Sequence, residues 1–287
     1  MTDALGGGLA LGLALALFSA ITSAFAHATL KSGDDKLAVM AWIRLVELTS
    51  ALPFVLWIGL PPDDLWPWIL GAVALHALYQ LILSWSYTVS DFTAAYPIAR
   101  GFTPIFTALL GIVVLGDRLD GIALAGIAIV SGGILALATS RALTPAGLLA
   151  ACLTGLLTTA YTLIDARGVR AAPDPLTFIA WFYLICGVPI PLMLLIRSGR
   201  RTAALLAHDV RPGLAAGVLA LLSFAPALFA FGMAPVGAVA ALRETSVLIG
   251  LVIGAVMLKE RLDRRRIGGG LLVTAGMLTI IVSAAFA

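Results

Sequence analysis

The chain has 287 residues, of which 61% are hydrophobic and 11% are charged, and its mean hydropathy is +1.07. A soluble globular domain carries about 25% charged residues, so this composition excludes one. The net charge of +3 comes from basic residues in short connections that form no continuous basic face, which excludes nucleic acid as a partner. A membrane-spanning helix needs about 20 apolar residues, so the length allows about ten spans with short connections.

Ten apolar runs of membrane-spanning length follow one another along the chain. Because they are continuously apolar and do not alternate, they predict an all-α integral membrane protein and not a β-barrel. The first run has no basic segment before it, which a secretory signal requires, so we interpret it as an uncleaved helix. Charged or turn-rich connections separate the runs, the longest at 165–174 and 197–212. The expected spans are 4–26, 37–60, 67–89, 92–115, 121–140, 145–164, 176–196, 213–232, 235–258 and 267–287.

One stretch of the first half recurs in the second half. Residues 94–120 match residues 237–263 at an offset of 143 positions, which places Arg100 on Arg243. The charged stop after the fourth span, Asp117–Asp120, falls on Glu260–Asp263 at the same offset, and beyond it two glycines match two glycines: Gly126 with Gly269, and Gly133 with Gly276. Matching leucines would mean little in so apolar a chain, but a matching arginine within a span is hard to obtain by chance. The sequence therefore predicts two copies of one unit.

Each predicted unit contains five spans, at residues 1–142 and 143–287. An odd number of spans makes the second unit enter the membrane from the opposite side, so we expect two inverted five-helix repeats. This architecture places a substrate site near the middle of the bilayer, between the repeats.

Five charged residues fall inside the apolar spans: Arg44, Glu47, Arg100, Arg243 and Glu244. Each such cation costs about 2.5–3.5 kcal/mol at mid-membrane, so these side chains are expected to face the protein interior or water. Arg44 and Glu47 are three residues apart and can pair on one helix face. Two hypotheses follow: a buried ion-pair network that locks the halves together, or the wall of a substrate cavity. Three cations against two anions leave one positive charge that an anionic substrate group would neutralise.

Other polar residues lie close to these charges in the sequence. His76, Tyr79 and Gln80 are three to four positions apart and form one polar stripe on a helix. Pro97 and Pro104 flank Arg100, and each removes a backbone hydrogen bond and kinks its helix. We expect Glu47 and Glu244 to balance charge or couple protons. The predicted substrate-binding residues are Arg100, Arg243, Tyr96, Tyr79, His76 and Arg44.

No catalytic constellation is recognisable in the sequence. It contains no nucleotide-binding glycine loop, no nucleophile elbow and no paired histidine metal motif. Its two cysteines, Cys152 and Cys186, both lie in apolar spans, where their spacing fits neither a metal site nor a disulfide framework. We therefore expect no catalytic residues, no metal and no cofactor. Without an ATP motif, any transport is expected to be secondary.

The two sides of the membrane differ in basic residues. Three lysines and arginines lie in connections on the side that both termini share, and twelve lie on the other side. Because basic loops stay in the cytoplasm, this count predicts that the termini face outward.

The chain resembles the ten-helix EamA family of the drug/metabolite transporter superfamily. It shares with that family ten spans in two inverted repeats of five, and an acid-Arg-Leu sequence after the fourth and ninth spans. The residues that carry the resemblance are Ala94–Pro104 with Gly116–Leu119 and Ala240–Arg243 with Lys259–Leu262. Asp117 stands where the family usually has glutamate. The segment Tyr96–Gly101, with His76 and Tyr79 upstream, is similar to the subgroup found beside phosphonate-utilisation genes.

The resemblance implies a multi-pass secondary carrier of the cell inner membrane that exports amino acids or related metabolites and holds its substrate between the two halves. The expected partners are a small molecule, the lipid bilayer and a proton or other coupling ion, and the expected assembly is a monomer or homodimer. Family members are taken to keep both termini in the cytoplasm, which conflicts with the count of basic residues. Two alternatives stay open: a flippase for a lipid-linked headgroup, and a membrane-embedded enzyme or assembly subunit.

Overall fold

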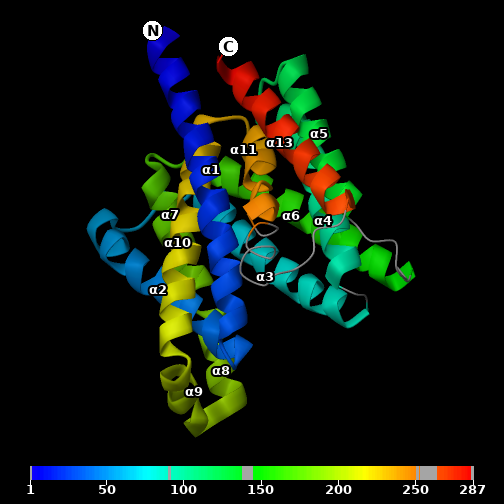
Figure 1. Cartoon of the computed structure of the whole chain (residues 1–287). Coiled ribbons are helices and arrows are strands. Elements are labelled where there is room, and N and C mark those ends of the chain that lie inside the picture. The colour runs from blue at the N-terminus through cyan, green and yellow to red at the C-terminus, as the bar shows by residue number, and fades with distance from the viewer. Residues whose placement is uncertain (1, 90–91, 138–144, 250–251, 253–263, 286–287) are drawn as a thin grey trace.

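A computed structural model describes residues 2–89, 92–137, 145–249, 252 and 264–285. These residues form helices and no strands (Figure 1). The helices of the first half are α1 (Thr2–Ser32), α2 (Lys36–Ile58), α3 (Trp66–Val89), α4 (Phe92–Leu110, with a π-helix over Gly111–Leu115) and α5 (Gly121–Leu137). Those of the second half are α6 (Pro145–Ala171), α7 (Pro175–Cys186), α8 (Pro189–Ser198), α9 (Thr202–His208), α10 (Val210–Met233), α11 (Val236–Arg243) and α13 (Arg264–Ala285).

Among the described residues, the expected spans are present as helices, the ninth only in part. Within the described residues, seven helical segments are long and apolar enough to cross a membrane, and two shorter apolar helices cover 99–115 and 121–137. The remaining span is the ninth, of which the structure describes residues 235–249. The protein is therefore an all-α membrane protein whose ten spans form two inverted repeats, as predicted. Residues 138–144 lie outside the described part, so the proposed boundary between 142 and 143 stays a prediction.

The helices differ from the predicted spans in several places. The sixth helix does not end at residue 164 but continues to Ala171, because the first residue that must interrupt it is Pro173. The seventh span is split into α7 and α8 around Gly187 and Val188, where Pro189 begins the second helix. The expected connection 197–212 contains a 3₁₀ turn, α9 and the start of α10.

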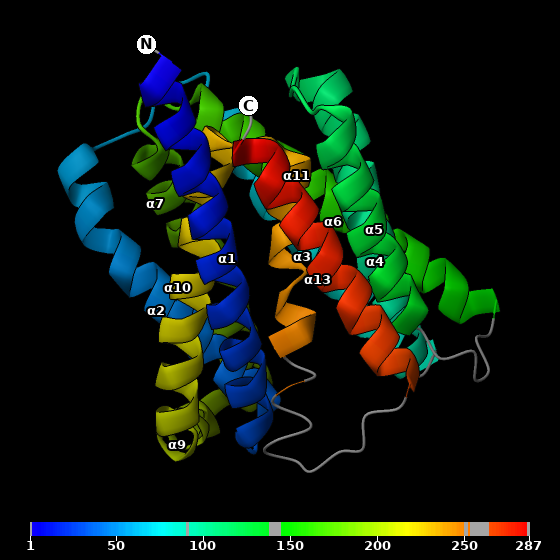
Figure 2. The ribbon, with the colours of Figure 1, turned by 45° about the horizontal axis from the view of Figure 1, so that its top comes forward.

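Helix pairing follows the inverted symmetry. α1 packs against α10, and its repeat counterpart α6 packs against α3; α1 also contacts α11, as α6 contacts α4. The helices α5 and α13 pack against each other, as do α4 and α11. Figures 1 and 2 show both termini at the same end of the bundle, which we call the terminal end; the opposite end carries α9.

The crossing of α5 and α13 depends on the repeated glycines. A Cβ added at Gly126 would lie 2.9 Å from the carbonyl oxygen of Gly276, and one added at Gly133 would lie 2.9 Å from that of Gly269. The repeat maps each of these contacts onto the other. Glycine is required here because only a residue without a side chain lets the two backbones approach so closely.

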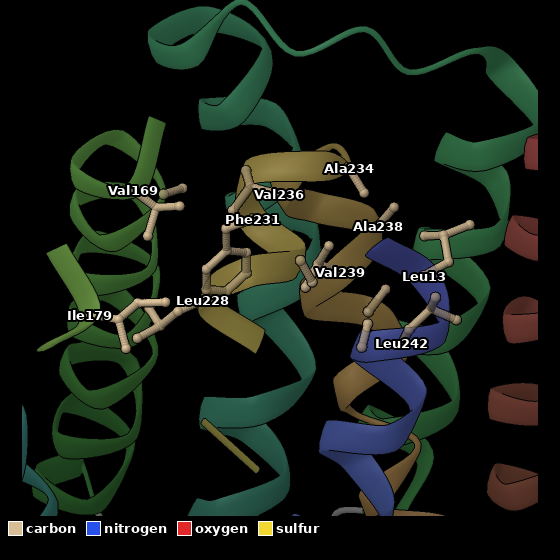
Figure 3. Packing of buried hydrophobic residues seen from close by; sticks show 14 of the residues in the cluster. Leu13, Val169, Ile179, Leu228, Phe231, Ala234, Val236, Ala238, Val239 and Leu242 are labelled. Atoms are coloured by element: carbon tan, nitrogen blue, oxygen red, sulfur yellow. The ribbon is translucent and has the colours of Figure 1, made fainter. Parts of the chain in front are cut away.

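Apolar side chains make up the interior of the terminal end. Figure 3 shows Leu13 of α1, Val169 of α6, Ile179 of α7, Phe231 of α10 and Val239 of α11 in one cluster, all of them buried. The outer surface is apolar as well: Val113, Leu56 and Ile196 are each more than 70% exposed. A soluble protein would not leave such side chains in water, whereas lipid chains can cover them.

Candidate functional site

A central cavity of about 260 Å³ lies between the repeats. Ser23 and Ala26 line it from the last third of α1, and Met40 lines it from the first turns of α2. Both positions are toward the end of the bundle opposite the termini, so the cavity occupies the middle of the bundle and extends toward that end. Its wall comprises Ser23, Ala26, Met40, Ile43, Arg44, Glu47, His76, Tyr79, Gln80, Arg100, Tyr161, Phe182, Ile190, Ala220, Ser223, Phe224 and Arg243.

Two of the three arginines in the cavity wall form ion pairs. Arg44 Nη1 lies 2.6 Å from Glu47 Oε2, on one face of α2 as their spacing predicts. Arg100 Nη1, from α4, lies 2.7 Å from Glu244 Oε1, which follows α11, so this pair joins the two repeats. Both glutamates are almost fully buried, and each places its charge against a guanidinium. A buried charge without a partner would cost far more than either pair does.

Arg243 is the third arginine, and it is held differently. Its Nε donates to Ser19 Oγ at 3.0 Å, and its guanidinium carbon lies 5.4 Å from the ring centre of Phe224. Across the described ranges, no carboxylate comes within ion-pair distance of it. Arg243 thus carries a positive charge into the cavity wall that no carboxylate of the described residues neutralises directly.

The α-helix is interrupted at the same residue. α11 ends at Arg243, and Glu244 and Thr245 form a turn before helical structure resumes at Ser246. The amide of Glu244 still donates to the carbonyls of Ala240 and Ala241, so the turn remains hydrogen-bonded. Helices interrupted near the membrane midplane are a common way for transporters to build a substrate site. No proline causes this interruption.

A wall of aromatic rings faces the arginines. The rings of His76 and Tyr161 have centroids 4.1 Å apart, and Tyr79 meets Tyr161 edge to face at 5.2 Å. Phe182 and Phe224 lie 5.0 and 5.5 Å from the His76 ring. Behind this wall, His76 Nε2 lies 3.0 Å from Oδ2 of Asp165, a residue with no exposed surface.

The structure brings most of the predicted site residues together. Arg44, Glu47, His76, Tyr79, Arg100 and Arg243 all line the central cavity, and Glu244 reaches it through Arg100. Pro104 is buried in α4, and the described backbone stays helical past it to Leu110. Tyr96 and Pro97 fall in residues 92–98, whose side chains lie outside the described part.

Sequence reasoning missed several residues of the site. Asp165 was assigned to a connection, although Tyr161 and Asp165 are four positions apart on one helix face and no proline lies between Asp165 and Pro173. Tyr161, Phe182 and Phe224 are aromatic residues in apolar spans, and nothing local distinguishes them from core residues.

The terminal end is closed by a different ion pair. Asp117 Oδ1 accepts from Arg170 Nη1 at 2.6 Å, while Asp117 Oδ2 accepts from the amide of Val236, the first residue of α11. Arg170 also donates to the carbonyls of Phe231 and Ala234. A second cavity of about 490 Å³ lies near this end, with a mostly apolar wall that shares no residue with the central cavity.

Three potential metal ligands, Asp34, His208 and Asp209, lie together at the other end. Asp209 is buried, but both of its oxygens accept backbone amides: Asp34 N at 3.0 Å and Asp35 N at 2.9 Å. His208 Nε2 lies 2.8 Å from Asp34 Oδ2. These contacts join two connections of the chain, and they account for the cluster without a bound ion.

Comparison with known proteins identifies a matching family and a solved structure with a similar fold. The family described as EamA-like transporter family matches residues 6–139 and again residues 145–282. A protein of known crystal structure is similar in fold, with a TM-score of 0.73 and 15% identity over 97% of this chain and 99% of the other. A search of curated proteins found no match.

Proposed function

The chain belongs to the EamA-like transporter family, and from this premise we propose that it is a secondary transporter of a small anionic or zwitterionic metabolite, such as an amino acid or a related compound. The family resemblance inferred from the two charged stops is confirmed, and the members of this family are membrane transporters of small molecules. We further propose that the protein is an exporter of the cell inner membrane and works by alternating access.

The observation that carries the proposal is the position of Arg243. It lines a cavity between the repeats, at the end of an interrupted helix, and no carboxylate pairs with it within the described residues. A carboxylate or phosphonate group of a substrate would supply that partner and form charge-assisted hydrogen bonds with the guanidinium. The aromatic rings of Tyr79, Tyr161 and Phe224 would contact the rest of a small substrate.

The direct test is uptake into proteoliposomes of alanine, lactate and methylphosphonate by wild type and by Arg243→Gln. Removing one partner of a desolvated charge pair costs about 2–5 kcal/mol, so we expect substrate binding to weaken at least about 30-fold. Arg200→Gln is the matched control, because Arg200 lies in the exposed connection before α9. Unchanged transport by a folded Arg243→Gln variant would remove this arginine from the site.

Arg100 needs a double variant, because Arg100→Gln alone leaves Glu244 buried without its guanidinium. Arg100→Gln combined with Glu244→Gln removes both charges and restores a neutral contact. If the pair only holds the repeats together, the double variant should fold and transport nearly as wild type does. If Arg100 binds the substrate, the double variant should fold but transport poorly.

A further inference from the structure

We propose that His76 and Asp165 form a proton-binding site, and that the protein moves one proton together with each monovalent anion in the same direction. This proposal rests on the proposed function and adds the coupling ion and its stoichiometry.

The first argument is the isolation of Asp165. It lies within α6 and has no exposed surface, its Oδ2 lies 3.0 Å from His76 Nε2, and its Oδ1 has no hydrogen-bond partner among the described residues. A buried carboxylate with a neutral neighbour carries an uncompensated charge, which is costly in a membrane interior. A proton on His76 turns the pair into a neutral ion pair.

The second argument is the access that His76 provides. Asp165 does not line the central cavity, but His76 does, from the middle of α3. With the Nε2 hydrogen donated to Asp165, the other ring nitrogen of His76 is the atom that takes up the proton. The step forms one N–H bond with a proton from water and breaks the same bond on release.

The pair has several charged or titratable neighbours. Glu47 of α2 acts electrostatically on His76. Tyr161 of α6 acts on Asp165, as do Tyr183 and Cys186 of α7. From α10 the neighbour is the uncharged ring of Phe224, and the arginines Arg44, Arg100 and Arg243 face the same cavity. Glu47 is paired with Arg44, and Arg100 is paired with Glu244, so these four residues add no net charge to the site. The net charge of the site is therefore set by Arg243 and the His76–Asp165 pair.

Charge balance then fixes the stoichiometry. In the empty protein without the proton, the positive charge of Arg243 offsets the negative charge of the His76–Asp165 pair. When a proton neutralises that pair, a monovalent anion balances Arg243. Only these two states carry no net charge in the site, and moving one elementary charge across the membrane potential costs about 2.3 kcal/mol per 100 mV. The neutral states are therefore the ones that change sides readily. The direction follows the two gradients, so an anion in excess inside the cell leaves with its proton.

The deciding measurement is made on wild-type protein in proteoliposomes that contain a pH-sensitive dye, with lactate and methylphosphonate as probes at a pH where each is mainly a monoanion. We expect one proton per anion and a rate that an imposed potassium-diffusion potential does not change. Anion transport with no proton movement, or with a net current, would overturn this proposal but leave the proposed function standing. Transport of alanine alone would likewise overturn this proposal and leave the proposed function standing, whereas transport of none of alanine, lactate and methylphosphonate would contradict the proposed function itself.

Variants then place the proton. Asp165→Asn should keep exchange of labelled for unlabelled anion, which needs no net proton movement, while proton-driven accumulation falls by at least about tenfold. His76→Gln leaves Asp165 charged, so the anion-loaded site carries a net negative charge, and both exchange and proton-driven accumulation should fall. His208→Gln is the matched control, because this exposed histidine also lies beside an aspartate but does not line the central cavity. If Asp165→Asn does not fold, the assignment is tested by His76→Gln together with the proton-to-anion stoichiometry of the wild type. Proton coupling that survives in both variants would refute the assignment.

Discussion

The two ends of the bundle interior are built from different kinds of side chain. At the terminal end, aliphatic and phenyl groups make up the interior around a mostly apolar cavity, and one ion pair, Asp117–Arg170, holds the first turn of α11. Toward the other end lie a cavity, three arginines and a row of aromatic rings. α11 runs from one region to the other, since Val236 bonds to Asp117 and Arg243 reaches the cavity. This difference predicts that substitutions at the terminal end mainly alter folding, and that substitutions at the central cavity mainly alter transport.

The largest effect is expected from Asp117→Ala. It leaves Arg170 without its carboxylate and the Val236 amide without its acceptor, and each such partly buried group left unpaired costs about 1–3 kcal/mol. Thermal unfolding of the purified protein in detergent would measure the loss. Asp117→Glu should retain most of the stability, and Asp63→Ala, in the exposed α2–α3 connection, is the control. Stability of Asp117→Ala equal to that of the control would mean that the pair does not hold the terminal end.

The next largest effect is expected where the repeats cross. A Cβ at Gly133 would lie 2.8 Å from the amide nitrogen of Val273, so Gly133→Ala should cost about 1–3 kcal/mol through overpacking. The neighbouring Gly132 has nothing within 4 Å of an added Cβ, so Gly132→Ala should be neutral or stabilise the helix by up to about 1 kcal/mol. Equal unfolding temperatures for the two variants would contradict the close crossing of α5 and α13.

Much of this architecture was predictable because membrane spans exclude charge. Arg100 and Arg243 stand out in apolar runs, their common offset reveals the repeat, and the repeat then predicts that both face the space between the halves. Gly126 and Gly133 were recognised only as matching positions. Their contact with Gly276 and Gly269 became visible when the structure placed α5 against α13.

The rest depended on tertiary contacts. A charge is the usual sign of a connection, and this misled the assignment of Asp165, whose burial is possible only because His76 comes from another helix to meet it. The interruption after Arg243 has no proline or glycine beside it, so no local signal could locate it. Phe224 resembles a core residue until Arg243 is placed over its ring.

At the cavity, Phe224→Leu should alter transport more than stability. It keeps an apolar side chain but removes the ring face that Arg243 covers, a contact worth about 0.5–1 kcal/mol where the cation is partly solvated. We expect the apparent affinity for an anionic substrate to fall by about two- to fivefold, with little change in unfolding temperature. Phe102→Leu is the control, because this phenylalanine is 40% exposed on α4 and does not line the cavity. An equal loss of affinity in both variants would contradict a specific role for the ring.

The smallest effect is expected at the far end, where Asp209 joins the connection after α1 to the start of α10. Burial opposes ionisation of this carboxyl, but hydrogen bonds from the amides of Asp35 and Asp34 outweigh it and hold the pKa of Asp209 below its ordinary value. A lowered folded-state pKa contributes stability that is present above the unfolded pKa of about 4 and is lost as the pH falls through the folded value. Unfolding temperatures measured between pH 6 and pH 3 should therefore fall less steeply for Asp209→Asn than for wild type, although the variant starts lower at neutral pH because an amide offers only one acceptor oxygen. Parallel curves would show that the Asp209 carboxylate does not fasten this end of the bundle.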